Sequence, residues 1–385
     1  FAGPGAVIFI NTGLLAAMTH EDELAGILCH EVIHVYSRHI SDRIERSKKV
    51  GVVTLAGLVA AIALGAAGVG AAANAAAIGS IAAGQTMELA YSREDEIQAD
   101  QLGLQVLAKV GYSAQGLLEI MEKIRARQWF GSNQVPGYLR THPAAEERVV
   151  YIANWIDSHA DTNDQSLQKR DLDPYRFKKI RNLVLARHSD SATARAYFES
   201  ELRSDPQDGL DHYGLGLVLE RSGEYDDAIV QLRKALKKNA FDADLLADLG
   251  RVYFKNRRYA DATTALQGAL SIDPDQMEGR YYLGRTQLEL GNNREAVMNL
   301  EKVARYNKDY MDTAYFLGSA YGRAGNMAEA HYLLGRYYME KGETKTALVQ
   351  LTLALEKTSD PDRRSEIEAL IEELKRREPP AKPSG

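Results

Sequence analysis

The pattern of hydrophobic and polar positions in the N-terminal part of the chain predicts one short strand and two long helices. The apolar run at residues 6–10 follows a turn sequence of glycine and proline, which is typical of a β-strand. Helical periodicity begins near Thr19, which can cap the helix, with Asp22 at the capping-box position, and continues to about Ser47. A second helix is expected over residues 88–110. This part is therefore predicted to be mainly α-helical with a small β-sheet.

A 34-residue period dominates the C-terminal half of the chain. The repeated positions are a glycine, an alanine twelve residues later and a leucine four residues after the alanine, as in Gly216, Ala228 and Leu232. The glycine recurs at Gly250, Gly284 and Gly318. This is the helix-turn-helix period of tetratricopeptide repeats, so the sequence predicts an array of such repeats.

The repeat pattern changes at both ends of the array. The first repeat, around Asn182, lacks the glycine. Toward the C-terminus, Gly335 follows Gly318 by only 17 residues. One helix at about 328–341 is therefore expected to serve as the second helix of one repeat and the first helix of the next. We expect about five to six repeats in all.

These patterns divide the chain of 385 residues into two domains with a linker and a tail. Residues 1–157 form the first domain, and residues 174–378 form an α-solenoid that closes with a charged, amphipathic end cap. The polar residues 158–173 are predicted to be a linker, and the proline-rich residues 379–385 a disordered tail. The net charge of −6 and the pI near 5.9 argue against a nucleic-acid partner.

The candidate chemistry begins with His30, Glu31 and His34, which form an HExxH motif. Positions i and i+4 share one face of a helix, so both imidazoles can bind one cation, and Glu31 lies about 100° around the helix, where a general base belongs. The ligand types favour Zn²⁺, one per chain, which would activate a water and polarise a scissile carbonyl. The motif therefore predicts a peptide hydrolase. His39, nine residues after His30, is expected on the opposite helix face, at the surface.

The third metal ligand must come from another element. Four acidic residues of the second predicted helix are candidates: Glu94, Asp95, Glu96 and Asp100. Glu96 and Asp100 share a helix face, so one can bind the metal while the other orients a ligand histidine. Spacing alone does not choose between them.

The segment between the two motifs, residues 50–87, carries no charged residue. Its first half, residues 50–69, is long enough to span a bilayer, whereas its second half, residues 71–86, is mostly alanine and glycine and would insert poorly. Because both motifs must return to one metal, the segment crosses a membrane twice or not at all. We favour no crossing, with an apolar helical hairpin packed over the site, dipping into a membrane surface, or buried in the domain.

The motifs and their order resemble the gluzincin family that includes HtpX, Oma1 and the CAAX prenyl proteases. The resemblance rests on residues 1–13, the HExxH motif, Ser92-Arg93 and the Glu96-x-x-Ala99-Asp100-x-x-Gly103 pattern, and the attached repeats narrow it to BepA-like members. It implies that Glu96 is the third ligand and that Asp100 supports the site from behind. It also implies that an extended peptide substrate pairs with the edge of the early strand, formed by Val7, Ile8, Phe9 and Ile10.

Two further residues enter through the same resemblance. Family members carry a Thr-His-Pro sequence near the end of the protease domain, matched by residues 141–143. His142 could then donate to the tetrahedral oxyanion or occupy the open zinc position at rest. Arg148, six residues later, is a weaker candidate for the rim of the same site.

The leading hypothesis is a zinc metalloendopeptidase whose repeats recruit protein or peptide substrates. The resemblance implies a bacterial periplasmic location, possible contact of residues 50–87 with a membrane surface, and a role in envelope protein quality control. Its expected partners are the outer-membrane assembly machinery or client proteins, bound in the groove of the repeats. The first alternative is a chaperone-like repeat scaffold for outer-membrane assembly with latent or suppressed protease activity. The second alternative is an integral membrane protease of the CAAX type.

Overall fold

A computed structural model divides the chain into two compact units, residues 1–189 and residues 190–385. The described residues are 2–3, 5–41, 44–45, 91–129, 142, 145–159, 170–306, 310 and 312–377. The predicted hairpin of residues 50–87, most of the predicted linker and the predicted tail lie outside these residues. In the part of the chain that is described, no helix combines the length and the apolar character needed to cross a membrane.

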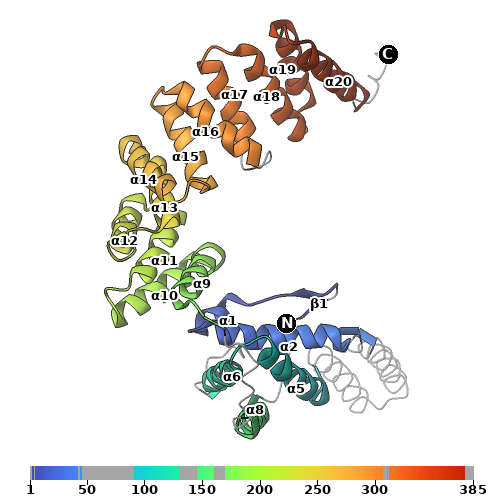
Figure 1. Cartoon of the computed structure of the whole chain (residues 1–385), viewed down its shortest axis with the longest axis vertical. Helices are drawn as coiled ribbons and strands as arrows, with labels where there is room; N and C mark the ends of the chain where they lie inside the picture. Colours follow the sequence, from blue (N-terminus) through green and yellow to red (C-terminus); the bar gives the residue numbers. More distant parts are fainter. Residues whose placement is uncertain are drawn as a thin grey trace, which may run out of the picture. The chain divides into compact units, whose positions relative to one another are not determined.

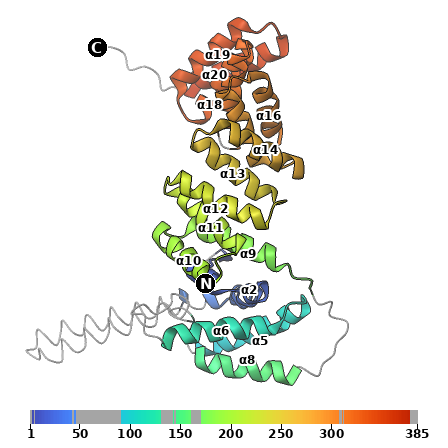
Figure 2. The ribbon, with the colours of Figure 1, turned by 90° about the vertical axis from the view of Figure 1, so that its left-hand side faces the viewer.

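The first unit is mainly helical with a very small sheet, as the sequence predicts. Strands β1 (Ala2–Gly3) and β2 (Val7–Ile8) pair antiparallel, with Ala2 opposite Ile8 and Gly3 opposite Val7. The helices are α1 (Thr12–Ala17), α2 (Glu21–Tyr36), α5 (Arg93–Lys109), α6 (Ala114–Trp129), α8 (Ala145–His159) and α9 (Pro174–His188). Figures 1 and 2 show α2 beside α5 and α6, with α8 against these two helices.

Helix α2 begins and ends differently from the sequence prediction. Its capping carboxylate is Glu23, which accepts hydrogen bonds from the backbone N–H groups of Thr19 and His20 at 2.5 and 3.3 Å. The predicted capping residue Asp22 instead accepts from the backbone N–H of Ser113 and ties α2 to the start of α6. The helix ends at Tyr36, short of the predicted Ser47.

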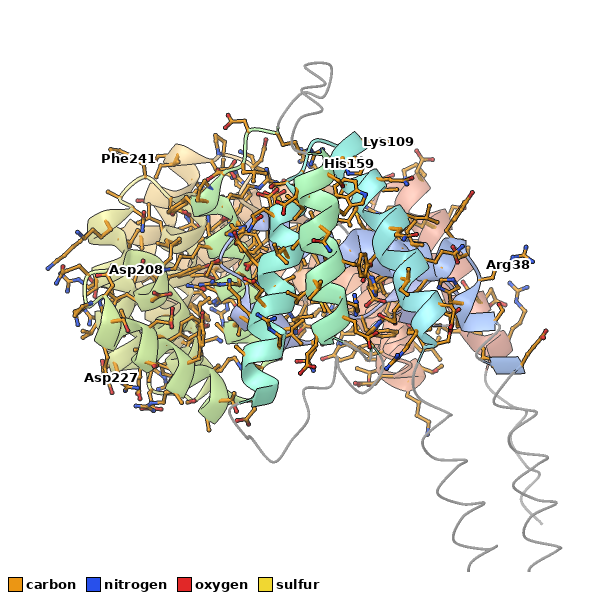
Figure 3. All side chains as sticks on the ribbon, turned by 90° about the horizontal axis from the view of Figure 1, so that it is seen from below. Arg38, Lys109, His159, Asp208, Asp227 and Phe241 are labelled. Atoms are coloured by element: carbon orange, nitrogen blue, oxygen red, sulfur yellow. The ribbon has the colours of Figure 1, made fainter. Side chains whose placement is uncertain are left out.

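The early end of α2 has a local cause in the backbone at Arg38. Arg38 has a φ of 61°, a left-handed conformation that breaks the helix, and helical backbone resumes at His39. The Arg38 side chain is exposed and points away from the unit (Figure 3). Periodicity counted along one straight helix therefore misplaces every residue after Ser37.

Close helix packing in the first unit depends on small residues at the contacts. A β-carbon added at Gly116 of α6 would lie 2.4 Å from the backbone carbon of Asp22, and one at Gly26 of α2 would lie 2.9 Å from Cβ of Leu117. A β-carbon added at Gly103 of α5 would lie 3.4 Å from the Cα atom of His30. The core around these contacts is aliphatic, with Ile27, Leu104, Leu117, Ile120, Met121 and Ile152 among its buried members. These contacts fix the distances of α2 from α6 and from α5.

Helix α9 is the first helix of the array by sequence period, and the structure groups it with the first unit. Phe177 of α9 belongs to the first unit's core. Nη1 of Arg181 donates a hydrogen bond of 2.6 Å to the carbonyl oxygen of Met18, just after α1. This buried contact ties α9 to the first unit.

The second unit is a run of antiparallel helix pairs, which confirms the predicted repeat array (Figure 1). Its helices are α10 (Ser191–Ser204), α11 (Gly209–Arg221), α12 (Tyr225–Lys238), α13 (Ala243–Lys255), α14 (Tyr259–Ile272), α15 (Met277–Glu289), α16 (Asn293–Tyr306), α17 (Thr313–Arg323), α18 (Met327–Glu340), α19 (Thr344–Lys357) and α20 (Pro361–Arg377). Each helix buries one face against its neighbours, which is how a repeat that cannot form a core alone becomes stable.

The repeated glycine and leucine pack against one another across each helix pair. A β-carbon at Gly250 would lie 2.4 Å from Cγ of Leu266, and one at Gly284 would lie 2.7 Å from Cγ of Leu300. Helix α18 takes part in two such contacts, because its Leu334 faces α17 while its Gly335 faces Leu351 of α19. The helix shared by two repeats, predicted at 328–341, is therefore α18.

We expect Gly250→Ala to destabilise the array and Gly268→Ala to stabilise it. In Gly250→Ala the new methyl group collides with the buried Leu266, and overpacking of this kind costs about 1–3 kcal/mol. In Gly268→Ala the nearest atom is 3.7 Å away, so only the helix propensity changes, by up to about 1 kcal/mol in favour of folding. Urea unfolding followed by circular dichroism measures both. Equal shifts for the two variants would contradict the packing argument.

Candidate active site

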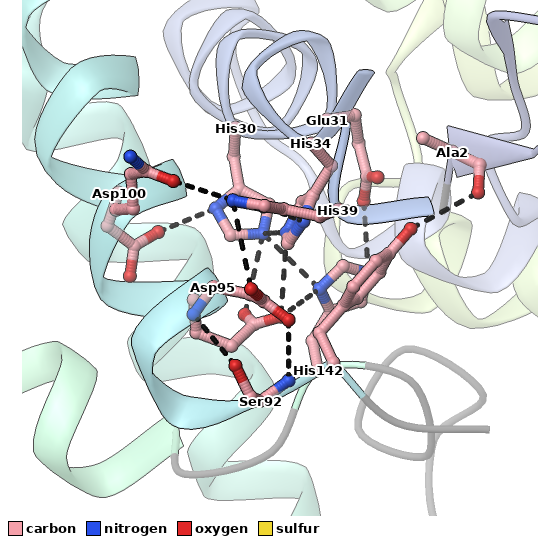
Figure 4. A network of polar contacts seen from close by, with 12 residues as sticks. Ala2, His30, Glu31, His34, His39, Ser92, Asp95, Asp100 and His142 are labelled. Atoms are coloured by element: carbon pink, nitrogen blue, oxygen red, sulfur yellow. Dashed lines mark hydrogen bonds and ion pairs between the residues drawn. The ribbon is translucent and has the colours of Figure 1, made fainter. Parts of the chain in front are cut away.

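His30 and His34 lie on the same buried face of α2 and turn their rings toward one another (Figure 4). Their Nε2 atoms are 3.0 Å apart, and neither side chain is exposed to solvent. Burial lowers the pKa of His34, and the neighbouring His30 and His142 lower it further, which favours the neutral imidazole. A neutral imidazole is the form that binds a metal ion.

Glu96 and Asp100 reach the two imidazoles from α5 in different ways. The carboxylate oxygens of Glu96 lie 3.5 Å from Nε2 of His30 and 3.5 Å from Nε2 of His34. Asp100 lies behind His30, where Oδ1 accepts a hydrogen bond of 2.7 Å from Nδ1. A cation between the two Nε2 atoms would therefore meet Glu96 and not Asp100. The geometry supports Glu96 as the ligand and Asp100 as the residue behind His30. This is the assignment that the family resemblance implies and that spacing alone left open.

Arg148 is buried inside the site instead of lying at the rim, where the sequence analysis placed it. Its Nε and Nη2 donate to the two carboxylate oxygens of Asp100 at 2.7 and 2.8 Å, and its Nη1 lies 2.8 Å from Oε2 of Glu96. The cause is the packing of α8 against α5, which directs the guanidinium inward. Burial alone would raise the pKa of Asp100, but Arg148 and His30 outweigh it and lower this pKa to about 2. Asp100 is therefore a carboxylate at neutral pH.

His142 lies at the centre of the site although it is distant in sequence from both motifs. Its Nδ1 is 2.9 Å from Oε1 of Glu96 and 3.3 Å from Nε2 of His30. Its Nε2 faces the other way, 3.2 Å from Oε1 of Glu31 (Figure 4). Burial would lower the pKa of His142, but Glu96 and Glu31 raise it. The residue thus contacts both the candidate ligands and the candidate base.

Glu31 stands beside the donor atoms and not among them. It is fully buried, and burial alone would raise the pKa of its carboxyl group. His142, by hydrogen bonding and charge, together with His30, outweighs burial and lowers this pKa to about 2. Glu31 is therefore ionised and able to accept a proton.

The donor set fits one divalent cation. One atom each from His30, His34, Glu96 and His142 lies within 4.8 Å of the others. Ligand atoms around tetrahedral Zn²⁺, at bond lengths of about 2.0–2.1 Å, lie about 3.3 Å apart, close to the spacings given above. The buried cluster also holds three carboxylates and one guanidinium, a net charge of −2 when the imidazoles are neutral. Burying such a charge is costly unless a cation compensates it, so the residues present fit Zn²⁺ in both geometry and charge.

Two site residues were missed by the sequence analysis. His39, expected at the surface, is only 3% exposed, and its Nδ1 lies 3.0 Å from Nδ1 of His34. The prediction was wrong because the left-handed backbone at Arg38 redirects the chain. Tyr91, just before α5, stacks on the His34 ring with centroids 3.9 Å apart, and its hydroxyl donates to the carbonyl oxygen of Ala2. No sequence motif points to Tyr91. His39 could have been considered, because it is a histidine, a common metal ligand, and lies five positions after His34.

The predicted substrate edge is shorter than residues 7–10. Only Val7 and Ile8 form strand β2, and among the described residues β2 pairs with β1 alone. The side chains of Val7 and Phe9 are about half exposed, at 48% and 51%. This exposure leaves room for the predicted strand pairing, which remains a proposal.

Comparison with known families matches both parts of the chain. Residues 1–156 match peptidase family M48. Residues 183–232, 213–277 and 281–331 match the tetratricopeptide repeat family. Together these matches agree with a metal-dependent peptidase domain followed by a repeat array.

Curated relatives match part of the chain. The chain is 25% identical over 256 residues to the beta-barrel assembly-enhancing protease of Yersinia pestis, covering 65% of this chain and 51% of that protein. It is 26% identical over 253 residues to the protein of that name from Escherichia coli strain K12, covering 65% and 50%. It is 25% identical over 169 residues to the mitochondrial metalloendopeptidase OMA1 of Saccharomyces cerevisiae, covering 43% and 46%. The chain therefore spans about half the length of the curated relatives it matches.

We expect Asp100→Asn to weaken zinc binding about 10–100-fold, the usual cost of changing a residue that orients a ligand histidine. The substitution removes the charge that Arg148 clamps and weakens the hydrogen bond from His30. Competition with a chromophoric chelator measures the affinity. Glu94→Gln, an exposed change on the same helix, is the matched control and should bind zinc like the parent chain. Equal affinities for the two variants would remove Asp100 from the site.

Proposed function

We propose that this chain, which joins a domain of the zinc-dependent peptidase family M48 to an array of tetratricopeptide repeats, is an endopeptidase of the bacterial periplasm. The observation that carries the proposal is the convergence of His30, His34 and Glu96 on one point, with ionised Glu31 beside them. We assign the first three residues as zinc ligands, Glu31 as general base and Asp100 as the residue that orients His30.

The roles of the side chains follow from their positions. The two imidazoles and Glu96 would hold Zn²⁺, which would supply a Lewis acid for activating a water and polarising the scissile carbonyl. Glu31 accepts the proton of the attacking water on its carboxylate and delivers it to the departing amine. Asp100 accepts from Nδ1 of His30, which keeps Nε2 of that ring directed at the cation. Arg148 holds Asp100 in place with two parallel hydrogen bonds.

Substrate is expected to bind as an added strand. The exposed side chain of Val7 lies on β2 and that of Phe9 just after it, and strand β2 contacts α2, the helix that carries Glu31. An extended peptide that pairs with β2 would gain main-chain hydrogen bonds that do not depend on its sequence. We therefore expect broad sequence preference and strong preference for unfolded segments.

His142 places the enzyme in a closed state. Structural zinc sites have four protein ligands, whereas catalytic sites keep one position for water. Nδ1 of His142 completes a set of four donor atoms, and its Nε2 engages the general base Glu31. We propose that His142 must leave this position before a water and a substrate carbonyl can enter.

The repeat array supplies the partner-binding surface. Within this unit, helices α16, α17, α18 and α20 line a cavity of about 380 Å³ whose wall carries Arg305, Tyr321, Glu329, Tyr332, Arg336 and Arg363. A mixed wall of aromatic rings and charged groups suits a polypeptide segment. The names of the bacterial relatives support a role in envelope and outer-membrane protein quality control, with assembly machinery or client proteins as partners. Contact of residues 50–87 with a membrane surface stays a prediction that concerns residues outside the described ones.

A chaperone-like scaffold is the second candidate function, and the position of His142 favours it. If the site stays closed, the array binds its clients while cleavage is suppressed. This reading predicts that a cleavage-dead variant still supports client assembly. Failure of that variant to support assembly would contradict it.

We expect Glu31→Gln to lower the cleavage rate of an unfolded test protein such as casein by at least about 10³-fold, because the amide cannot accept the proton. Zinc content should remain one ion per chain, since Glu31 is not a ligand. Rate assays with metal analysis test this prediction. Retention of the parent rate with full zinc content would disprove the mechanism.

We expect His142→Ala to raise the cleavage rate about tenfold or more, as removal of a competing ligand does when the closed state is populated at least about 10:1. The zinc affinity should fall at the same time, because one donor is lost. His188→Ala, an exposed change on α9, serves as the control. A lower cleavage rate in His142→Ala would instead assign His142 to oxyanion stabilisation.

A further inference from the structure

We propose that His39 is a positioning residue for the metal site, which fixes the tautomer and orientation of His34 through a direct hydrogen bond between the two imidazoles. The inference rests on the proposed zinc site and concerns a residue that no motif includes. Its basis is a chain of contacts that runs from the donor set to the surface of α5.

The contacts form a continuous line of three side chains. Nδ1 of His39 lies 3.0 Å from Nδ1 of His34, and the ring planes cross at 72°. On its other side, Nε2 of His39 lies 2.7 Å from Oε1 of Gln98. His39 is 3% exposed, whereas Gln98 is exposed, so the line connects a buried ligand to solvent.

The direction of each hydrogen bond follows from elementary imidazole chemistry. If His34 binds the cation through Nε2, its single proton is on Nδ1, which then donates to Nδ1 of His39. His39 must accept there, so its own proton is on Nε2 and is donated to Oε1 of Gln98, an atom that can only accept. The reverse direction would place a proton on Nε2 of His34, facing His30. His39 therefore selects the tautomer of His34 that can bind metal.

The two ligand histidines are supported by groups of different charge. His30 lies against Asp100, a carboxylate, whereas His34 lies against the imidazole of His39. A carboxylate behind His34 would add a fourth buried anion to a cluster that already holds three carboxylates and one guanidinium. A neutral acceptor orients the ring without disturbing that balance. Tyr91 stacks on the same ring with an interplanar angle of 24°, so the ring plane and its in-plane direction are both held.

The backbone at Arg38 is the feature that brings His39 to this position. A non-glycine residue at a φ of 61° adopts a conformation of higher energy, and such residues concentrate at functional sites. The Arg38 side chain is itself exposed and points away from the unit (Figure 3). The role we assign to this turn is therefore to position the next residue, His39. On a straight helix His39 would lie away from His34.

A pair of variants separates positioning from packing. In His39→Asn the side-chain oxygen takes the place of Nδ1 and still accepts a hydrogen bond, whereas His39→Leu has a similar shape without an acceptor. We expect the zinc affinity of His39→Asn to stay within about threefold of the parent and that of His39→Leu to fall about 10–100-fold. The probes are Zn²⁺ alone, in competition with a chelator, and the visible spectrum of the Co²⁺-loaded chain. His159→Leu, at the exposed end of α8, is the control.

The outcomes distinguish this inference from the proposed function. A packing role predicts the opposite ranking, because leucine fills the buried space at residue 39 better than asparagine. Equal affinities for the two variants, or the higher affinity in His39→Leu, would overturn the inference while the zinc site stands. A parent chain that binds no zinc under metal-replete conditions would instead refute the proposed function. Loss of affinity only in His39→Leu, with a changed Co²⁺ spectrum and unchanged unfolding of the metal-free chain, is the expected result.

Discussion

Electrostatic balance in a dry interior is the constraint on which the first unit depends. Glu31, Glu96 and Asp100 are all buried, and Arg148 is the one cationic side chain that the described residues bring against this cluster. Carboxylates in such a place are tolerated only if opposite charge and hydrogen bonds compensate for the lost water. One divalent cation beside Arg148 would complete the compensation. Helices α2, α5 and α8 each contribute part of the cluster, so the same balance that suits a cation also ties these helices together.

The two ligand histidines show how this balance is kept while both rings are oriented. His30 is supported by the Asp100–Arg148 pair, in which the negative charge is already neutralised. His34 is supported by His39 and Tyr91, which bring no charge when His39 is neutral. The site therefore gains two fixed ligands without exceeding the charge that a single cation can balance. The site also requires α2 and α5 to lie close together. Gly103 of α5 permits this, because it has no side chain and faces the backbone of His30.

The sequence predicted those features that depend on spacing along one helix. His30 and His34 lie together because i and i+4 share a face, and the 34-residue period predicted the repeat array and the shared helix α18. The features that it missed depend on the relation between helices or on a single dihedral angle. Arg148 was placed at the rim because nothing in its local sequence shows that α8 packs against α5. His39 was placed at the surface because one residue with positive φ ends α2 early. The choice between Glu96 and Asp100 also required the position of α5 against α2.

The double contact of His142 links the two parts of the proposed closed state. One ring nitrogen of His142 fills the fourth donor position, and the other engages the carboxylate of Glu31. A water that enters the site needs both the free position and the free base, and a single side chain withholds both. Displacement of His142 would free both together, and a signal that shifts its position by a few kcal/mol would convert the population from closed to open almost completely. We therefore propose that the position of His142 controls the activity, while the ligands and their supporting residues remain in place.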